Sequence, residues 1–181
     1  VMSVSGDTVL ILVVFWALFV GYLVTTKAYR YDDFSFVASR LSSNLANIIV
    51  LFIISVFAGV TTFLSNYILR VILPLSDNMN YVKSTSIFDE PYISFINVLF
   101  MIVVIFTMAA GGYLGGMLVQ NFKIFKIIWP VIFLVLVATK TGQSILSFIF
   151  TNNDPILLLI VKLFLITIIL FGVSIISSNR L

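Results

Sequence analysis

The side chains that most often carry out chemistry in proteins are scarce in this sequence. Its 181 residues include seven Asp and Glu residues, no His and no Cys. The usual zinc ligands, thiol nucleophiles and imidazole bases are therefore excluded, and we expect neither a metal site nor a cofactor. The acidic residues lie in polar segments or near the N-terminus, whereas intramembrane aspartyl catalysis needs two carboxylates at membrane depth. The motif GxxxxGKS or GxxxxGKT of P-loop ATPases is also missing, so we do not expect an enzyme.

Two lysines interrupt apolar sequence and are candidates for lining a polar pathway. Lys162 lies about 10 Å into the last apolar run if that run begins near Pro155. It either extends its ammonium group to the membrane surface or faces a wet cavity, because no acidic residue within the membrane can pair with it. If Lys140 faces the same cavity, the two charges would favour an anionic or amphipathic cargo. The sequence leaves these alternatives open.

Composition indicates an integral membrane protein built from helices. Hydrophobic residues make up 61% of the chain and charged residues 9%, which is too little polar surface for a soluble domain of this length. Several apolar runs are long enough for helices that cross a hydrocarbon core of about 30 Å. We therefore predict an all-α, polytopic protein with a single transmembrane domain. Its five predicted spans are residues 9–26, 48–69, 93–119, 124–150 and 156–176.

The fourth of these spans is irregular. Its apolar part at residues 127–138 is only about 18 Å long as a helix, and the polar sequence KTGQS follows at residues 140–144. In one alternative the helix begins near Phe122, and Lys123 and Lys126 reach the inner membrane surface. In the other, the span breaks at KTGQS and the next apolar piece re-enters the membrane or lies in its outer leaflet.

Basic residues predict the orientation of the spans. One side of the predicted membrane has six of them and the other side has three: Lys27, Arg30, Arg40, Lys123, Lys126 and Arg180 against Arg70, Lys83 and Lys140. Lys and Arg favour the cytoplasmic side, so we predict an outside N-terminus and an inside C-terminus in the cytoplasmic membrane. Because the basic residues are scattered between apolar runs and form no stripe, nucleic acid is not an expected partner.

The most polar stretch, TKAYRYDDFSFVASRLSSNLAN at residues 26–47, is then cytoplasmic. As a helix it would carry one apolar stripe, formed by Phe34, Val37, Leu41 and Leu45. Such an amphipathic helix either lies flat among lipid headgroups or presents its polar side to a partner protein at the membrane surface. The stripe alone does not decide between the two.

The string GGYLGG in the third span predicts close packing of helices. Gly111 and Gly115 are four residues apart, as are Gly112 and Gly116, and Thr107 extends the first row. On a helix these rows form a flat groove where another backbone can approach, either in the same chain or in a second copy. A hinge is the alternative. The string is not a phosphate-binding loop, since no strand precedes it and no Lys-Ser or Lys-Thr pair follows it.

A second row of small and polar residues runs along one face of the second span. It consists of Ser55, Gly59, Thr62 and Asn66, at spacings of four, three and four. Such a row either packs and hydrogen-bonds against another helix or lines a path for polar cargo.

The order of these elements resembles that of type-2 permeases of bacterial ABC transporters, most of all those of Bacillota exporters. The resemblance rests on the cytoplasmic loop YRYDDFSFVASRLSSNLAN, the small-residue span after it, and the strings GGYLGGMLVQNFK and IIWPVIF. It covers the chain from about Val9 to the C-terminus. It implies a helical subunit that pairs with a second permease subunit and exports a substrate when a separate ATPase subunit drives it.

The resemblance also implies which residues meet the ATPase. Residues 33–44 would form the coupling helix, with contacts from Asp33, Phe34, Val37, Arg40 and Leu41. Residues 120–126 would form a second contact through Lys123 and Lys126, and residues 140–150 would correspond to a re-entrant segment. The family has six spans and cytoplasmic termini, so five spans with an outside N-terminus are expected for a chain that lacks the first helix. The alternative function is a non-transporting immunity or accessory protein that binds a peptide or partner helices.

Overall fold

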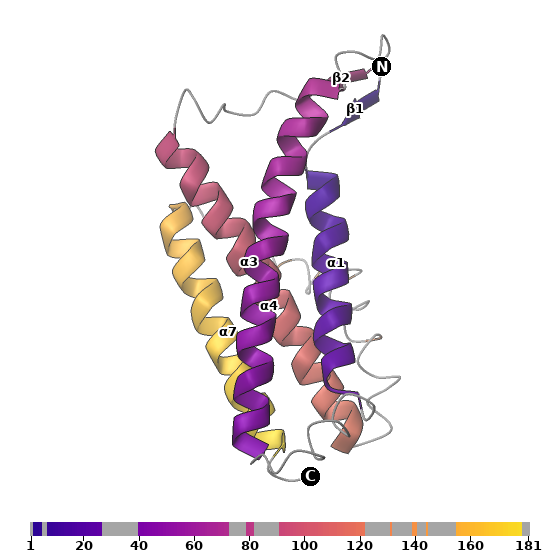
Figure 1. Ribbon diagram of the computed structural model, residues 1–181, viewed down its shortest axis with the longest axis vertical. Helices are drawn as coiled ribbons and strands as arrows, with labels where there is room; N and C mark the ends of the chain where they lie inside the picture. The colour runs from indigo at the N-terminus through magenta and orange to yellow at the C-terminus, as the bar shows by residue number, and fades with distance from the viewer. Residues whose placement is uncertain are drawn as a thin grey trace.

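The structure is a computed structural model in which helices account for nearly all of the residues described. It describes residues 2–4, 7–26, 40–72, 79–81, 91–121 and 155–178, together with residues 131, 139, 140 and 144. The helices are α1 (Asp7–Val24), α3 (Arg40–Ile72), α4 (Pro91–Asn121) and α7 (Ile156–Ser178) (Figure 1). Two three-residue strands, β1 (Met2–Val4) and β2 (Met79–Tyr81), pair in parallel, and this strand pair was not expected from the sequence. Apart from it, the predicted helical class is confirmed.

Three of the helices are long and apolar enough to cross a membrane. These segments are Leu41–Leu69 of α3, Pro91–Gln120 of α4 and Ile156–Ser178 of α7, and α1 adds a shorter apolar helix over Val9–Val24. At about 1.5 Å per residue, the 33 residues of α3 measure about 50 Å and extend beyond a hydrocarbon core of about 30 Å. The expectation of membrane-spanning helices is confirmed to this extent. The span predicted at residues 124–150 falls almost entirely outside the described residues.

Three helices run in one direction and α3 runs in the other. Figure 1 shows α1, α4 and α7 descending from the end of the bundle that carries the N-terminus, and α3 ascending toward it. We call the end at which α3 begins the lower end, as Figure 1 draws it. Although α4 and α7 follow each other among the described helices, α4 finishes at the lower end and α7 begins at the upper end. The chain between them therefore starts and finishes at opposite ends of the bundle.

Helix α4 lies at the centre and packs against the other three helices. Its buried residues Ile105, Ala109 and Tyr113 belong to one core cluster with residues of every other helix, among them Leu51 of α3 and Phe171 of α7. Aromatic rings pack against one another in the middle of this core. The centroid of the Phe106 ring lies 5.4 Å from that of Phe52 and 5.3 Å from that of Phe171. Such ring pairs add to the energy of burial.

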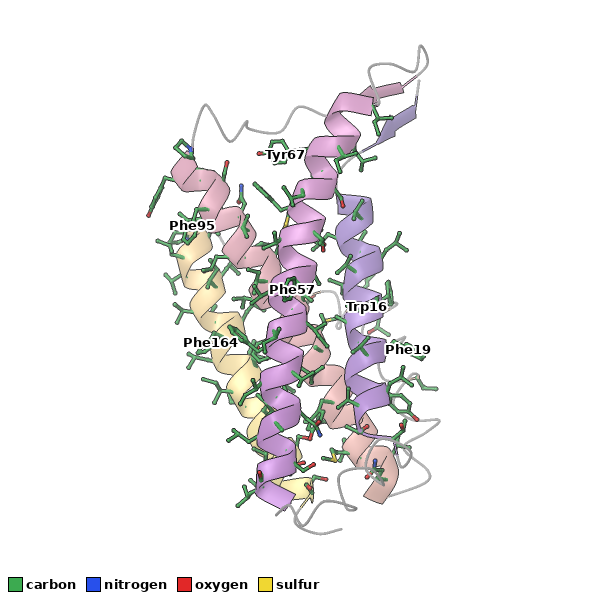
Figure 2. The ribbon with its side chains drawn as sticks, viewed as in Figure 1. Trp16, Phe19, Phe57, Tyr67, Phe95 and Phe164 are labelled. Atoms are coloured by element: carbon green, nitrogen blue, oxygen red, sulfur yellow. The ribbon has the colours of Figure 1, made fainter. Side chains whose placement is uncertain are left out.

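The outer surface of the bundle is apolar, while several polar side chains lie inside. Among the side chains labelled in Figure 2, Phe57 of α3 is 70% exposed and Phe95 of α4 is 68% exposed. The buried polar residues are Thr25, Asn44, Ser55, Thr62, Ser94, Thr167, Ser174 and Ser178. Water would penalise this distribution, whereas lipid tails solvate apolar side chains and leave polar groups to find partners within the protein. The arrangement therefore fits a bilayer.

The second spanning helix begins earlier than expected. α3 starts at Arg40, not at Ile48, so the last part of the predicted coupling helix, residues 40–44, forms the first turns of α3. No Gly or Pro lies between Arg40 and Ile48 to end a helix, and an unbroken helix satisfies its backbone hydrogen bonds internally. The last part of the polar stretch, residues 40–47, and the span therefore share one continuous helix.

Candidate functional site

The glycine groove of α4 is filled by α1. A Cβ atom on Gly112 would collide with the backbone carbonyl of Leu18, and one on Gly116 would collide with the Thr25 side chain. Helix α1 contributes Gly21 to the same contact, and Gly21 lies against the backbone of Ala109 in α4. Backbones approach this closely only where side chains are absent on both helices.

The two predicted glycine rows have different surroundings. The row of Gly112 and Gly116 packs on α1, whereas a Cβ on Gly111 would meet no atom within 4 Å. Gly115 is buried. Among the four glycines, Gly112 and Gly116 are thus shown to contact another helix of this chain.

Thr107, at the head of the other row, joins α4 to α7. Its hydroxyl lies 2.8 Å from that of Thr167, and within their own helices the hydroxyls of Thr107 and Thr167 lie 2.7 Å from the carbonyl of Val103 and 2.8 Å from that of Leu163. Each hydroxyl has one hydrogen, so one of the two donates to the other, while the second donates to the carbonyl in its own helix. In either direction, one hydrogen bond joins α4 to α7 and stabilises their contact.

The small and polar row of α3 faces α4. A Cβ on Gly59 would meet Ile102 of α4, and Ser55 and Thr62 are each 1% exposed. Their hydroxyls donate within α3, to the carbonyls of Leu51 and Ala58 at 2.8 and 2.7 Å. The hydrogen bonds of these two hydroxyls therefore stay within α3 and do not reach another helix. Asn66, at the end of the row, is half-buried and its Oδ1 atom has no partner.

A buried polar pair connects α3 and α4 at the lower end. The Tyr113 hydroxyl donates to Oδ1 of Asn44 over 2.9 Å, and the two side chains are 0% and 2% exposed. The Nδ2 atom of Asn44 has no partner. Ser174 of α7, also fully buried, has a hydroxyl without a partner. An unpaired polar group in a bilayer interior is costly, and two such atoms, in Asn44 and Ser174, lie toward the lower end, whereas that of Asn66 lies toward the other end of α3.

The two candidate pathway lysines lie in different settings. Lys162 is half-buried on the second turn of α7, and Lys140 is exposed, with its carbonyl accepting a 2.9 Å hydrogen bond from the Ser144 hydroxyl. The cavity that they would share stays a prediction.

Most of the residues expected to contact an ATPase lie outside the described residues, namely Asp33, Phe34, Val37, Lys123 and Lys126. Arg40 and Leu41 form the start of α3, and the Leu41 side chain is 61% exposed. Leu41 is therefore the one member of the predicted contact whose side chain is described.

Sequence reasoning did not single out Asn44, Tyr113 or Ser174. A signal for Asn44 exists in hindsight, because Asn44, Leu51 and Ser55 recur at helical spacing on the face of α3 that became buried. On α1, the spacing of four between Ala17, Gly21 and Thr25 marks the face that meets the glycine groove.

Comparison with known proteins finds no match, neither to a family model nor to a curated protein nor to a solved structure. The geometry of the bundle and the sequence pattern are therefore the basis for the function.

Proposed function

We propose that the chain is the membrane-spanning subunit of an ATP-driven exporter, and that a separate ATPase docks at the lower end of the bundle. In this proposal the lower end faces the cytoplasm and a second permease subunit completes the pathway. The observation that carries the proposal is the continuity of α3, which begins within the amphipathic polar stretch and runs without a break to Ile72. A force applied to that stretch reaches the far end of the bundle through one rigid helix.

The contacts of α3 provide a route for such a force. Asn44, one turn into α3, is hydrogen-bonded to Tyr113 of the central helix, and the Tyr113 ring lies 5.8 Å from that of Phe171 in α7. Movement of the start of α3 would therefore disturb all three spanning helices. A partner drives such a change only if it binds the two conformations with different affinity.

The alternative, a non-transporting protein that binds a peptide or partner helices in the glycine groove, is less well supported. The row of Gly112 and Gly116 is covered by α1 of the same chain. A partner helix would have to displace α1 or use the surface near Gly111, where an added Cβ atom would meet nothing within 4 Å.

The proposal is tested by Leu41→Asp in a tagged chain that is expressed in its own host cells and assayed for co-purifying ATP hydrolysis. Leu41 is exposed at the lower end, so a buried charge is not created, but the apolar contact with the ATPase is lost. We expect the tagged chain to stay in the membrane and to lose co-purifying ATP hydrolysis.

The matched control is Ile72→Asp, at the other end of the same helix and 54% exposed, which should keep the ATPase bound. Equal retention of ATPase activity by both variants would show that the lower end is not the docking site.

A further inference from the structure

The unpaired polar atoms at the lower end share one region of the core. Asn44 and Leu51 are seven residues apart and both buried, so they lie on the same face of α3, two turns from each other. Leu51, Tyr113 and Phe171 belong to a single buried cluster. Ser174 follows Phe171 by one turn on the buried face of α7. Asn44 and Ser174 therefore approach the same level of the bundle from α3 and α7, with Tyr113 of α4 between these helices.

The chemistry of the unpaired atoms restricts what can satisfy them. Nδ2 of Asn44 can only donate hydrogen bonds, so its partner must present an acceptor, which excludes a cation at that atom. The hydroxyl of Ser174 can donate and accept. No buried side chain in the part of the chain that the structure describes is charged, so nothing among them would balance a buried anion. The fitting ligand is small and neutral and has both a donor and an acceptor.

We propose that Asn44, Tyr113 and Ser174 form an internal hydration site between α3, α4 and α7, in which water bridges the amide of Asn44 to the hydroxyl of Ser174. Water meets each requirement, and buried waters typically make about three hydrogen bonds to polar groups that have no other partner. The bridge ties α7 to the α3–α4 pair at the lower end, where the aromatic core has given way to polar side chains. The site does not depend on the proposed transport function.

The direction in which Ser174→Ala changes the stability of the protein distinguishes a hydrated site from a dry one. Ser174→Ala removes the hydroxyl group. If no water binds that hydroxyl, its burial only costs free energy, and the variant should be as stable as the parent protein or more stable. If the hydroxyl holds water, the unfolding equilibrium constant in detergent should rise about two- to tenfold, the range of an ordinary hydrogen bond. A variant of unchanged or increased stability overturns the proposal.

A double-mutant cycle tests the bridge itself. Asn44→Leu and Ser174→Ala should be coupled, so that their combined effect on the unfolding constant is about two- to tenfold smaller than the product of the single effects. Additive effects overturn the proposal even if Ser174→Ala alone is destabilising, because the hydroxyl would then have an independent partner. If Asn44→Leu does not accumulate, Asn44→Ser, which also removes the amide, replaces it in the same cycle.

The matched control uses another asparagine of α3, Asn66. Asn66 also carries a buried atom without a partner, but it lies about 33 Å from Asn44 along the helix. Asn66→Leu and Ser174→Ala should therefore be additive. If Asn66→Leu were coupled to Ser174→Ala as strongly as Asn44→Leu is, the coupling would reflect a global effect on the bundle. That result would also overturn the proposed bridge.

Discussion

Gly111 and Gly112 are neighbours in sequence but have opposite surroundings. A methyl group on Gly112 would overlap the Leu18 carbonyl of α1, whereas one on Gly111 would enter open space. We expect Gly112→Ala to cost about 1–3 kcal/mol in unfolding free energy, the usual range for overpacking a well-packed interface. Gly111→Ala should be neutral or slightly stabilising, since Ala favours a helix. Denaturation of both variants in detergent measures the difference, and equal losses would contradict the assigned α1–α4 contact.

Single residues were predictable where spacing alone determines their role. GGYLGG indicated a groove because residues four apart share a helix face, but the spacing within the two glycine pairs, Gly111 with Gly115 and Gly112 with Gly116, is the same. Only the position of α1 distinguishes them. Asn44 was hidden for a related reason: it stands in a polar stretch, where an amide is unremarkable, and its burial depends on the helix continuing into the core.

At the scale of elements, the α4–α7 contact depends on a pair of threonines. Thr107→Val removes the hydroxyl that joins Thr167 and should weaken the bundle by about 0.6 kcal/mol, the average for interhelical hydrogen bonds in membranes. Thr61→Val is the matched control, because the exposed Thr61 bonds only to carbonyls of its own helix. The unfolding free energy measured in detergent should therefore be lower for Thr107→Val than for Thr61→Val. A loss in Thr61→Val as large as that in Thr107→Val would argue against the interhelical bond.

Helix existence was predictable from long apolar runs, whereas helix ends were not. Pro91 and Pro155 could be recognised as helix starts, since proline suits the first turn, where its missing N–H costs nothing. The start of α3 was placed at Ile48 because hydropathy falls before it. Backbone hydrogen bonding does not stop where hydropathy falls, and the helix continues to Arg40.

At the scale of the whole molecule, the arrangement of helices could not be read from their order. Charge counting predicted the side of each loop but not that α4 would become the central helix. That position follows from small side chains: Ala109, Gly112 and Gly116 let α1 approach one face, while larger residues such as Phe106 meet α3 and α7. Packing of this kind depends on shape across helices, which a linear sequence encodes only in part.

The orientation of α3 in the membrane is the most direct test of the account, because a cytoplasmic ATPase can act only on an end that faces the cytoplasm. The chain has no native Cys, so Leu41→Cys and Ile72→Cys each provide a single thiol at one end of α3, in positions that are 61% and 54% exposed. In intact cells, a membrane-impermeant maleimide should label Ile72→Cys and should label Leu41→Cys only after permeabilisation. Labelling of Leu41→Cys from outside, with Ile72→Cys protected, would contradict the proposed coupling end and with it the proposed function.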